Sequence, residues 1–482
     1  MNLYPKISIT ILTQFWVRII SYSSHLILSY FLAKNDFSLL AVITTIHLFV
    51  VGFKDFGTFQ YLLTAKNYNN ESYYVLLTNY CLNLIAFIFV CFLAYFFSEY
   101  YSDWRLLPLI IGINFLQFFT TYTSVIKLNL YKKNNFKAIG RIEATSNFVG
   151  IIILVIALIN DANIFAYLFS QIGITLSSLY LYTLKKNKLL QKKYSLNVFK
   201  KYIGKIKWLI LNKYSESLSL YGFYITLVFS VSQISLGVFY FGIKIYEIIA
   251  VYLSNILNQF LIPFFSKTKN ITKEREFFFK ISKLLCFFVG FLSLIFMIFA
   301  PILINEVWNS KWNDSINIFI VILTAFPIAL IGNVLSRNFI EYKREFKSIF
   351  LIKICEGICI ITFTYIGVSY NGILGAAISI SILKIVFSLY QYIKSSQILK
   401  IKLSYSLKEL FRNVFPYYSV LIFCYINNID IYNFKISLSM QLLSSLKLIT
   451  IISIYYIFSS ILINKNLISI LKNIYVDKKF EI

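Results

Sequence analysis

The chain has 482 residues, of which 59% are hydrophobic, 19% aromatic and 14% charged. A soluble protein of this length could not bury so much apolar surface, which excludes an ordinary globular domain. The formal net charge of +26 could suggest nucleic-acid binding, but the Lys and Arg residues cluster beside apolar stretches, where they suit anionic lipid head groups. The sequence therefore predicts a membrane protein that binds no nucleic acid.

Apolar stretches of roughly 17 to 25 residues, the length that crosses a ~30 Å hydrocarbon core as a helix, recur along the whole chain. The predicted ranges are 8–32, 38–64, 73–97, 106–128, 142–160, 163–184, 207–230, 236–264, 283–304, 315–336, 348–368, 371–393, 412–429 and 439–463. The first stretch is too long for the apolar core of a signal peptide and lacks an A-x-A site, so we predict a retained helix. The predicted fold class is all-α, a polytopic membrane protein with about fourteen transmembrane helices.

Positive charge is concentrated in alternate connections between these stretches. The basic connections lie around 127–141, 185–207, 267–283, 337–347 and 394–412, and the tail is basic as well. The connections between them are short and carry few Lys or Arg residues. By the positive-inside rule, the basic connections and both termini are predicted to be cytoplasmic.

A short motif occurs twice, six predicted helices apart. It reads Tyr131-Lys-Lys-Asn-Asn-Phe136-Lys137 and Tyr342-Lys-Arg-Glu-Phe346-Lys347. A basic loop could also recur under the positive-inside rule alone, and both explanations stay open. Taken as a repeat, the pair predicts two six-helix lobes plus two C-terminal helices, the construction of many secondary transporters. The predicted divisions are an N-lobe, 1–185; a basic cytoplasmic linker, 186–206; a C-lobe, 207–396; and a C-terminal region with a basic tail, 397–482.

Polar residues inside a span are costly in lipid and usually face a bundle interior or a watery cavity. One stripe at helical spacing in the first span consists of Gln14, Arg18, Tyr22, His25 and Ser29. We predict that it faces the interface between the lobes. The guanidinium of Arg18 suits a phosphate group, and a structural ion pair with Asp55 of the second span is the open alternative. For His25, an interior hydrogen bond and proton coupling are both open.

Further charged residues lie within later spans. The candidates for the same cavity are Lys54 and Asp55 in the second span, Lys213 and Glu216 in the seventh, and Lys244 and Glu247 in the eighth. The last two pairs are spaced i, i+3 and can neutralise each other on one helix. By the repeat, the seventh and eighth spans correspond to the first and second, so these charges are predicted to converge on the lobe interface. Glu356 and Lys384, in the eleventh and twelfth spans, are predicted to pair between helices rather than to bind a ligand.

Four stretches carry a resemblance to a known family. They are Lys54-Asp55-Phe56-Gly57, Lys127 to Ile152, Leu236 to Lys267, and Asn305 to Ile320. The chain resembles the Wzx-type polysaccharide flippases of the multidrug/oligosaccharidyl-lipid/polysaccharide exporter (MOP) superfamily over most of residues 1–400. Members of the family commonly have, in the third stretch, a helix that starts at a Gly and ends in a Pro followed by a Ser, and Gly237, Pro263 and Ser266 match this pattern. Trp312 matches a loop Trp of the family.

The chain also departs from the family pattern. Relatives often carry an Asp in the seventh span, where this chain has the run Tyr221-Gly-Phe-Tyr224. An ion-coupling role of that Asp does not transfer to this protein.

The resemblance implies translocation of a prenyl-diphosphate-linked oligosaccharide, by alternating access, across the bacterial inner membrane for O-antigen, capsular or other surface polysaccharide. The implied partners are the lipid-linked oligosaccharide, membrane lipids and a polysaccharide polymerase. No cofactor is implied, and H⁺ and Na⁺ are the candidate coupling ions. The alternatives are a multidrug exporter of the superfamily and a flippase for lipid-linked peptidoglycan precursor.

Enzyme classes find little support in the sequence. A membrane glycan polymerase, ligase or acyltransferase would be expected to carry catalytic residues in a sizeable outer loop, and the predicted outer connections are short. The sequence offers no Ser-His-Asp set, P-loop or metal-binding cluster, and it has 2 His residues in all. We therefore predict a non-enzymatic protein without catalytic residues or a metal site.

Overall fold

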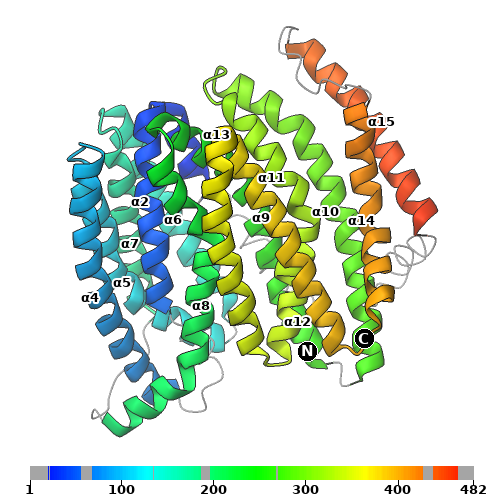
Figure 1. Cartoon of the computed structure of the whole chain (residues 1–482). Coiled ribbons are helices and arrows are strands. Elements are labelled where there is room, and N and C mark those ends of the chain that lie inside the picture. The colour runs from blue at the N-terminus through cyan, green and yellow to red at the C-terminus, as the bar shows by residue number, and fades with distance from the viewer. Residues whose placement is uncertain are drawn as a thin grey trace. The chain divides into compact units, whose positions relative to one another are not determined.

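The computed structural model describes residues 20, 22–55, 68–133, 135–185, 196–267, 270–426 and 438–464. Within these ranges the regular structure is helical throughout (Figure 1). After a helical segment at 22–31, the helices are α2 (Lys34–Asp55), α4 (Tyr68–Tyr100), α5 (Leu106–Lys132), α6 (Phe136–Ile159), α7 (Phe165–Thr183), α8 (Leu196–Ser230), α9 (Gln233–Lys267), α10 (Ile271–Val307), α11 (Asp314–Leu330), the π-helical η1 (Ile331–Ser336), α12 (Arg337–Tyr342), α13 (Phe346–Ile398), α14 (Leu403–Ile426) and α15 (Leu438–Ile463). Seven of the described helices are long and apolar enough to cross a membrane.

Every predicted span overlaps a described helix, which confirms the all-helical, polytopic fold class. The 53 residues of α13 correspond to two predicted spans. A straight helix of that length would measure about 80 Å, far more than a bilayer core. The backbone leaves helical geometry at Asn371 and at Gly372, where φ is +52°. Glycine adopts this left-handed conformation without strain, so it allows the chain to turn between the two spans.

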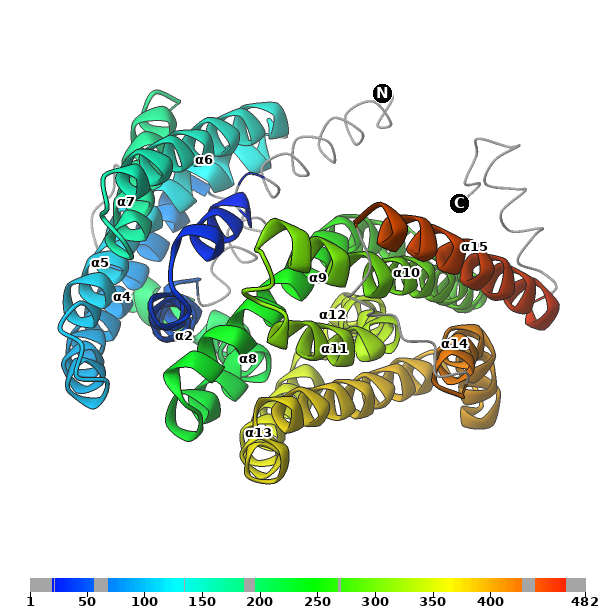
Figure 2. The same ribbon diagram turned by 90° about the horizontal axis from the view of Figure 1, so that it is seen from above.

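The chain divides into two compact units. The first contains residues 1–240 and 346–368, and the second contains 241–345 and 369–482. In the first unit, α4 packs on α5, α5 on α7 and α6 on α7, while α2 lies against α4, α5 and α8. Figure 2 shows α4 to α7 side by side, seen along the helices. In the second unit, α10 packs against α11, α14 and α15. The division into six-helix lobes at 185 and 207 stays a prediction.

Two glycines allow α6 and α7 to pack closely. A Cβ atom at Gly150 would lie 2.3 Å from Cγ1 of Ile174, and one at Gly173 would lie 2.3 Å from Cδ1 of Ile153. Ser170 of α7 also donates a hydrogen bond to the carbonyl of Gly150 at 2.9 Å. These contacts fix the rotation of α7, and with it the direction in which its polar residues point.

Candidate functional site: a polar cavity in the first unit

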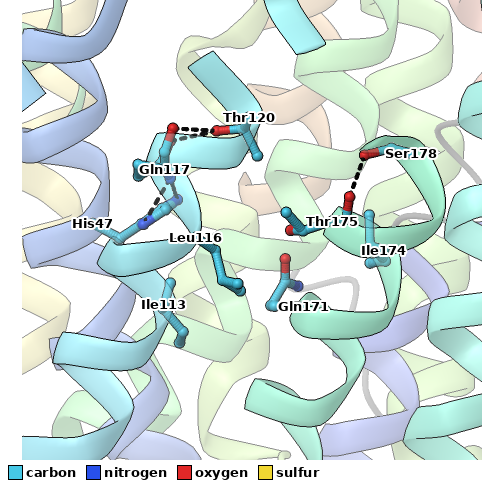
Figure 3. A pocket seen from close by; sticks show the side chains of 9 residues that line it. All are labelled: His47, Ile113, Leu116, Gln117, Thr120, Gln171, Ile174, Thr175 and Ser178. Carbon is cyan, nitrogen blue, oxygen red and sulfur yellow. Dashed lines mark hydrogen bonds between the residues drawn. The ribbon is translucent and has the colours of Figure 1, made fainter. Parts of the chain in front are cut away.

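A cavity of about 320 Å³ lies between α2, α5 and α7 (Figure 3). Its polar lining consists of His47, Gln117, Thr120, Gln171, Thr175 and Ser178, and its apolar lining of Ile113, Leu116 and Ile174. All nine residues belong to the first compact unit. Polar side chains on three adjacent membrane helices therefore share one space.

The cavity lies well inside the helices. His47, Gln117 and Thr175 are 13, 11 and 10 residues after the first residues of α2, α5 and α7. All three helices begin on the same side in the predicted topology. At about 1.5 Å per residue, the polar groups are ~15–20 Å along each helix, near the middle of a ~30 Å core. Substrate sites of secondary transporters commonly lie at this depth.

Gln117 is the centre of the hydrogen bonds in the cavity. Its Nε2 atom lies 3.0 Å from Nε2 of His47, and its Oε1 atom accepts a hydrogen bond from Oγ1 of Thr120 at 3.0 Å. The imidazole of His47 and the hydroxyl of Thr120 thus contact the two ends of the same carboxamide. The side chain of Gln117 is thus held from both sides and presents a defined amide to the cavity.

The wall formed by α5 is braced from behind by α4. Oγ1 of Thr121, the residue next to Thr120, accepts a hydrogen bond of 2.5 Å from Asn83 in α4. Thr121 in turn donates to the backbone carbonyl of Gln117 at 2.8 Å. These buried bonds hold the turn of α5 that carries Gln117.

The predicted stripe of the first span is described in part. Gln14 and Arg18 lie outside the described residues. Tyr22 and His25 are half-buried. The ring of His25 lies 5.8 Å from that of Tyr167 in α7 and 6.4 Å from that of Tyr240 in α9, measured between centroids. His25 is therefore packed among aromatic rings of the first unit, and it does not line the cavity at His47.

The charged pairs predicted for the site in the second, seventh and eighth spans lie on three different helices, α2, α8 and α9. Lys54 and Asp55 are the last two residues of α2, and their side chains lie outside the described part. As predicted, the other charges pair within their own helices: Lys213 lies 3.3 Å from Glu216, and Lys244 lies 2.6 Å from Glu247. Lys213, Glu216, Lys244 and Glu247 are not among the residues that line the cavity. Their convergence on a lobe interface stays a prediction.

The prediction for Glu356 is wrong. Its carboxylate lies 2.7 Å from Nζ of Lys353, one turn earlier in the same helix, and both residues are buried. An i, i+3 spacing suffices for this contact, so no second helix is needed. Lys384, in contrast, does contact another helix: its ammonium lies 5.1 Å from the ring centroid of Tyr246 in α9.

The cavity residues were not predicted from the sequence. The predicted site consisted of the charged residues of the spans and the polar stripe of the first span, whereas these nine lining residues are neutral apart from the ionisable ring of His47. A usable signal existed in helical spacing: Gln117 and Thr120 are three residues apart, and Gln171, Thr175 and Ser178 follow each other at four and three. Amides and hydroxyls that repeat on one face of an apolar helix indicate a shared polar space.

Comparison with known proteins identifies the family. The chain matches the family described as "Polysaccharide biosynthesis protein" (Polysacc_synt_3) over residues 27–317. This match covers more than half of the chain, and the protein belongs to that family. No curated protein matches the chain at the level required.

Solved structures show which fold the chain has. It is similar to a lipid II flippase, MurJ, in an inward closed conformation, with a TM-score of 0.70, 15% identity and coverage of 95% of this chain and 99% of that one. It is also similar to an inward-facing multidrug resistance MATE family transporter of the MOP superfamily, with a TM-score of 0.60, 11% identity and coverage of 83% and 98%. The Vibrio cholerae MATE transporter VcmN in its bent form follows, with a TM-score of 0.57, 11% identity and coverage of 83% and 97%. The chain thus has the fold of MOP-superfamily transporters, as the resemblance in its sequence predicted.

Proposed function

We propose that this protein translocates a prenyl-diphosphate-linked oligosaccharide from the cytoplasmic to the outer leaflet of a bacterial inner membrane. Both termini are cytoplasmic in this proposal, and the product supplies O-antigen, capsule or another surface polysaccharide. A polysaccharide polymerase is the proposed partner downstream. H⁺ and Na⁺ are the candidate coupling ions.

The observation that carries the proposal is the match of 291 residues (27–317) to a polysaccharide biosynthesis family by a chain with a transporter fold. A transporter fold in a sugar-polymer pathway suits the movement of an intermediate that is both lipid-bound and glycosylated. The polar cavity near the predicted midplane supports the proposal, since its amides and hydroxyls can bond sugar hydroxyls. The similarity to a lipid II flippase extends over 95% of the chain.

The membrane potential favours the proposed direction of transport. The diphosphate is anionic, and the outside of a bacterial inner membrane is positive. Moving each negative charge outward gains about 2.3 kcal/mol per 100 mV. The proposed cationic contacts, Arg18 first among them, would hold the diphosphate while the lobes rock between inward and outward states.

A multidrug exporter is the second candidate, favoured by the fold similarity to MATE transporters. Such a protein needs carboxylates or aromatic faces to hold cationic drugs. The lining of the described cavity has no carboxylate and no Phe, Tyr or Trp. This composition suits the neutral sugar part of the substrate in the first proposal better than a cationic drug.

The test is the lipid that accumulates in cells lacking this protein. We expect prenyl-diphosphate-linked oligosaccharide to collect on the cytoplasmic leaflet, and wild type to reverse this. An Arg18→Ala variant, confirmed in the membrane by immunoblot, should restore transport poorly. Sensitivity to cationic drugs without lipid accumulation would support the exporter instead. Accumulation of peptidoglycan precursor would identify that lipid as the substrate.

A further inference from the structure

The cavity between α2, α5 and α7 has a lining that selects against charged ligands. Its nine residues include no Asp, Glu, Lys or Arg. An anion such as a diphosphate meets no Lys or Arg among these nine residues, and a charge that leaves water without an opposite charge is unfavourable. An organic cation would meet neither a carboxylate nor a Phe, Tyr or Trp ring. A neutral polar group carries neither penalty.

The arrangement of the polar groups suits a ligand with several hydroxyl or amide groups. The carboxamides of Gln117 and Gln171 come from two different helices, and Figure 3 shows them on opposite walls. Each carboxamide has donors and an acceptor. Gln117 uses one donor toward His47 and part of its acceptor capacity toward Thr120, so the amide is oriented and still has bonds to offer.

The apolar residues of the lining complete the recognition of such a ligand. Ile113, Leu116 and Ile174 supply aliphatic surface between the polar groups. A pyranose ring presents hydroxyls at its edge and C–H groups on its faces, and so needs both kinds of wall. The volume of about 320 Å³ is at the lower end of ligand pockets and suits one sugar ring rather than a whole oligosaccharide.

We propose that this cavity binds one neutral sugar residue, with Gln117 and Gln171 as the residues that recognise its hydroxyl or acetamido groups. That the sugar belongs to the lipid-linked oligosaccharide rests on the function proposed above. The diphosphate is bound elsewhere, and the cavity selects for the glycan. Gln117 is positioned by Thr120 and His47, while Gln171 approaches from the facing helix.

The test is saturation-transfer NMR on the purified full chain in lipid nanodiscs, with N-acetylglucosamine, glucose, inorganic pyrophosphate and tetraphenylphosphonium as separate probes. We expect transfer to a neutral sugar, reduced about fivefold by Gln117→Leu and by Gln171→Leu, as loss of one or two hydrogen bonds predicts. Ser178→Ala should weaken binding, and Ser177→Ala should not. Ser177 is next to Ser178, outside the lining, and bonds its own helix at the carbonyl of Gly173.

Thermal unfolding of each variant shows whether it is folded. Because Gln117 and Gln171 lie on different helices, the test can still be read from one variant when the other does not fold. The proposal is overturned if neutral sugars give no transfer to wild type, or if both glutamine variants bind sugar as wild type does. Failure of the transport function is separate: it appears as a deletion strain without lipid-linked oligosaccharide accumulation, whatever the NMR result. Accumulation in the deletion strain, with full rescue by both glutamine variants and unchanged sugar binding, overturns the sugar site alone.

Discussion

The hydroxyl group of Tyr417 in α14 donates a hydrogen bond of 3.1 Å to the backbone carbonyl of Leu323 in α11. Leu323 is four residues before Pro327, which has no N–H to close the helical hydrogen bond to that carbonyl. The neighbouring Tyr418 donates to the carbonyl of Thr324, also at 3.1 Å. α14 therefore supplies the hydrogen bond to the carbonyl of Leu323 that Pro327 cannot donate within α11.

The last helix makes an equivalent contact to α10. The hydroxyl of Tyr456 in α15 donates to the carbonyl of Phe287 at 2.9 Å, beside Gly290, where a Cβ would lie 2.6 Å from that hydroxyl oxygen. The two C-terminal helices thus contact the backbone of α10 and α11 within the second unit.

The Tyr417→Phe variant should be less stable than wild type by about 1–3 kcal/mol, because the buried carbonyl of Leu323 loses its partner. Thermal unfolding of the purified protein in nanodiscs measures this. Tyr370→Phe is the matched control, since Tyr370 is 87% exposed. Equal melting temperatures for Tyr417→Phe and the control would contradict this role of the hydroxyl.

Gly237 marks a close approach between α9 and α2. A Cβ atom at this position would lie 2.6 Å from the backbone carbonyl oxygen of Lys34. Since a backbone oxygen cannot rotate away as a side chain can, we expect Gly237→Ala to lose about 1–3 kcal/mol of stability and Gly237→Val more. Ile234→Ala, a change at a half-exposed position one turn earlier, is the control. The graded series is read from melting temperature and from the amount of folded protein in the membrane. A stable Gly237→Val variant would show that α9 can move away from α2 at little cost.

The fold was predictable because the length of an apolar stretch is enough to recognise a membrane-spanning helix. The sequence predicted a connection at 368–371 between the two spans within α13, and the helix does turn next to it, at Asn371 and Gly372. The hydrogen bonds of Tyr417 and the π-helical η1 were not predictable, because both depend on which helices pack together. The spacing of residues within one segment of the chain does not show which other helix packs against it.

The candidate site was predicted less well than the fold. Most of the predicted site residues were chosen for their charge, and the uncharged Gln117 and Gln171 were therefore not predicted. The pairing of Glu356 with Lys353 was missed for another reason. The same i, i+3 spacing was recognised for Lys213 and Glu216, and it was equally visible here.

Acid should destabilise the connection between α4 and α5 through Asp103. The pKa of Asp103 is lowered from its ordinary value of 3.8, chiefly because its carboxylate accepts hydrogen bonds from the side chain of Arg105, which also lies 2.8 Å from Asp36. A lowered pKa adds stability above the ordinary value, and this is lost as the pH falls through the folded-state pKa. The contribution is thus present at neutral pH, decreases below about 3.8 and is lost once the pH falls below the lowered pKa.

The Asp103→Asn variant should therefore be less stable than wild type at neutral pH, with the difference shrinking in strong acid. Melting temperatures from neutral pH down to about pH 3 measure this. Asp161→Asn, which changes an exposed carboxylate in another connection, is the control. A difference between wild type and Asp103→Asn that stays the same at every pH would rule out the ionic contribution.

The ion pair of Lys353 and Glu356 in α13 is the charged contact best suited to separate structure from transport. Both residues are buried, at 3% and 2% exposed. Glu356→Gln replaces the carboxylate that pairs with the buried ammonium of Lys353 by a neutral amide, so this variant should be less stable than wild type. The double variant Lys353→Met, Glu356→Leu removes both charges and should be near wild type in stability. Melting temperature measures the stability of each variant, and reversal of lipid accumulation in the deletion strain measures its transport. A stable double variant that transports normally assigns the pair to folding alone. A stable double variant that fails to transport would give the pair a part in the transport cycle. A double variant as unstable as Glu356→Gln would show that packing, and not charge, determines stability at this position.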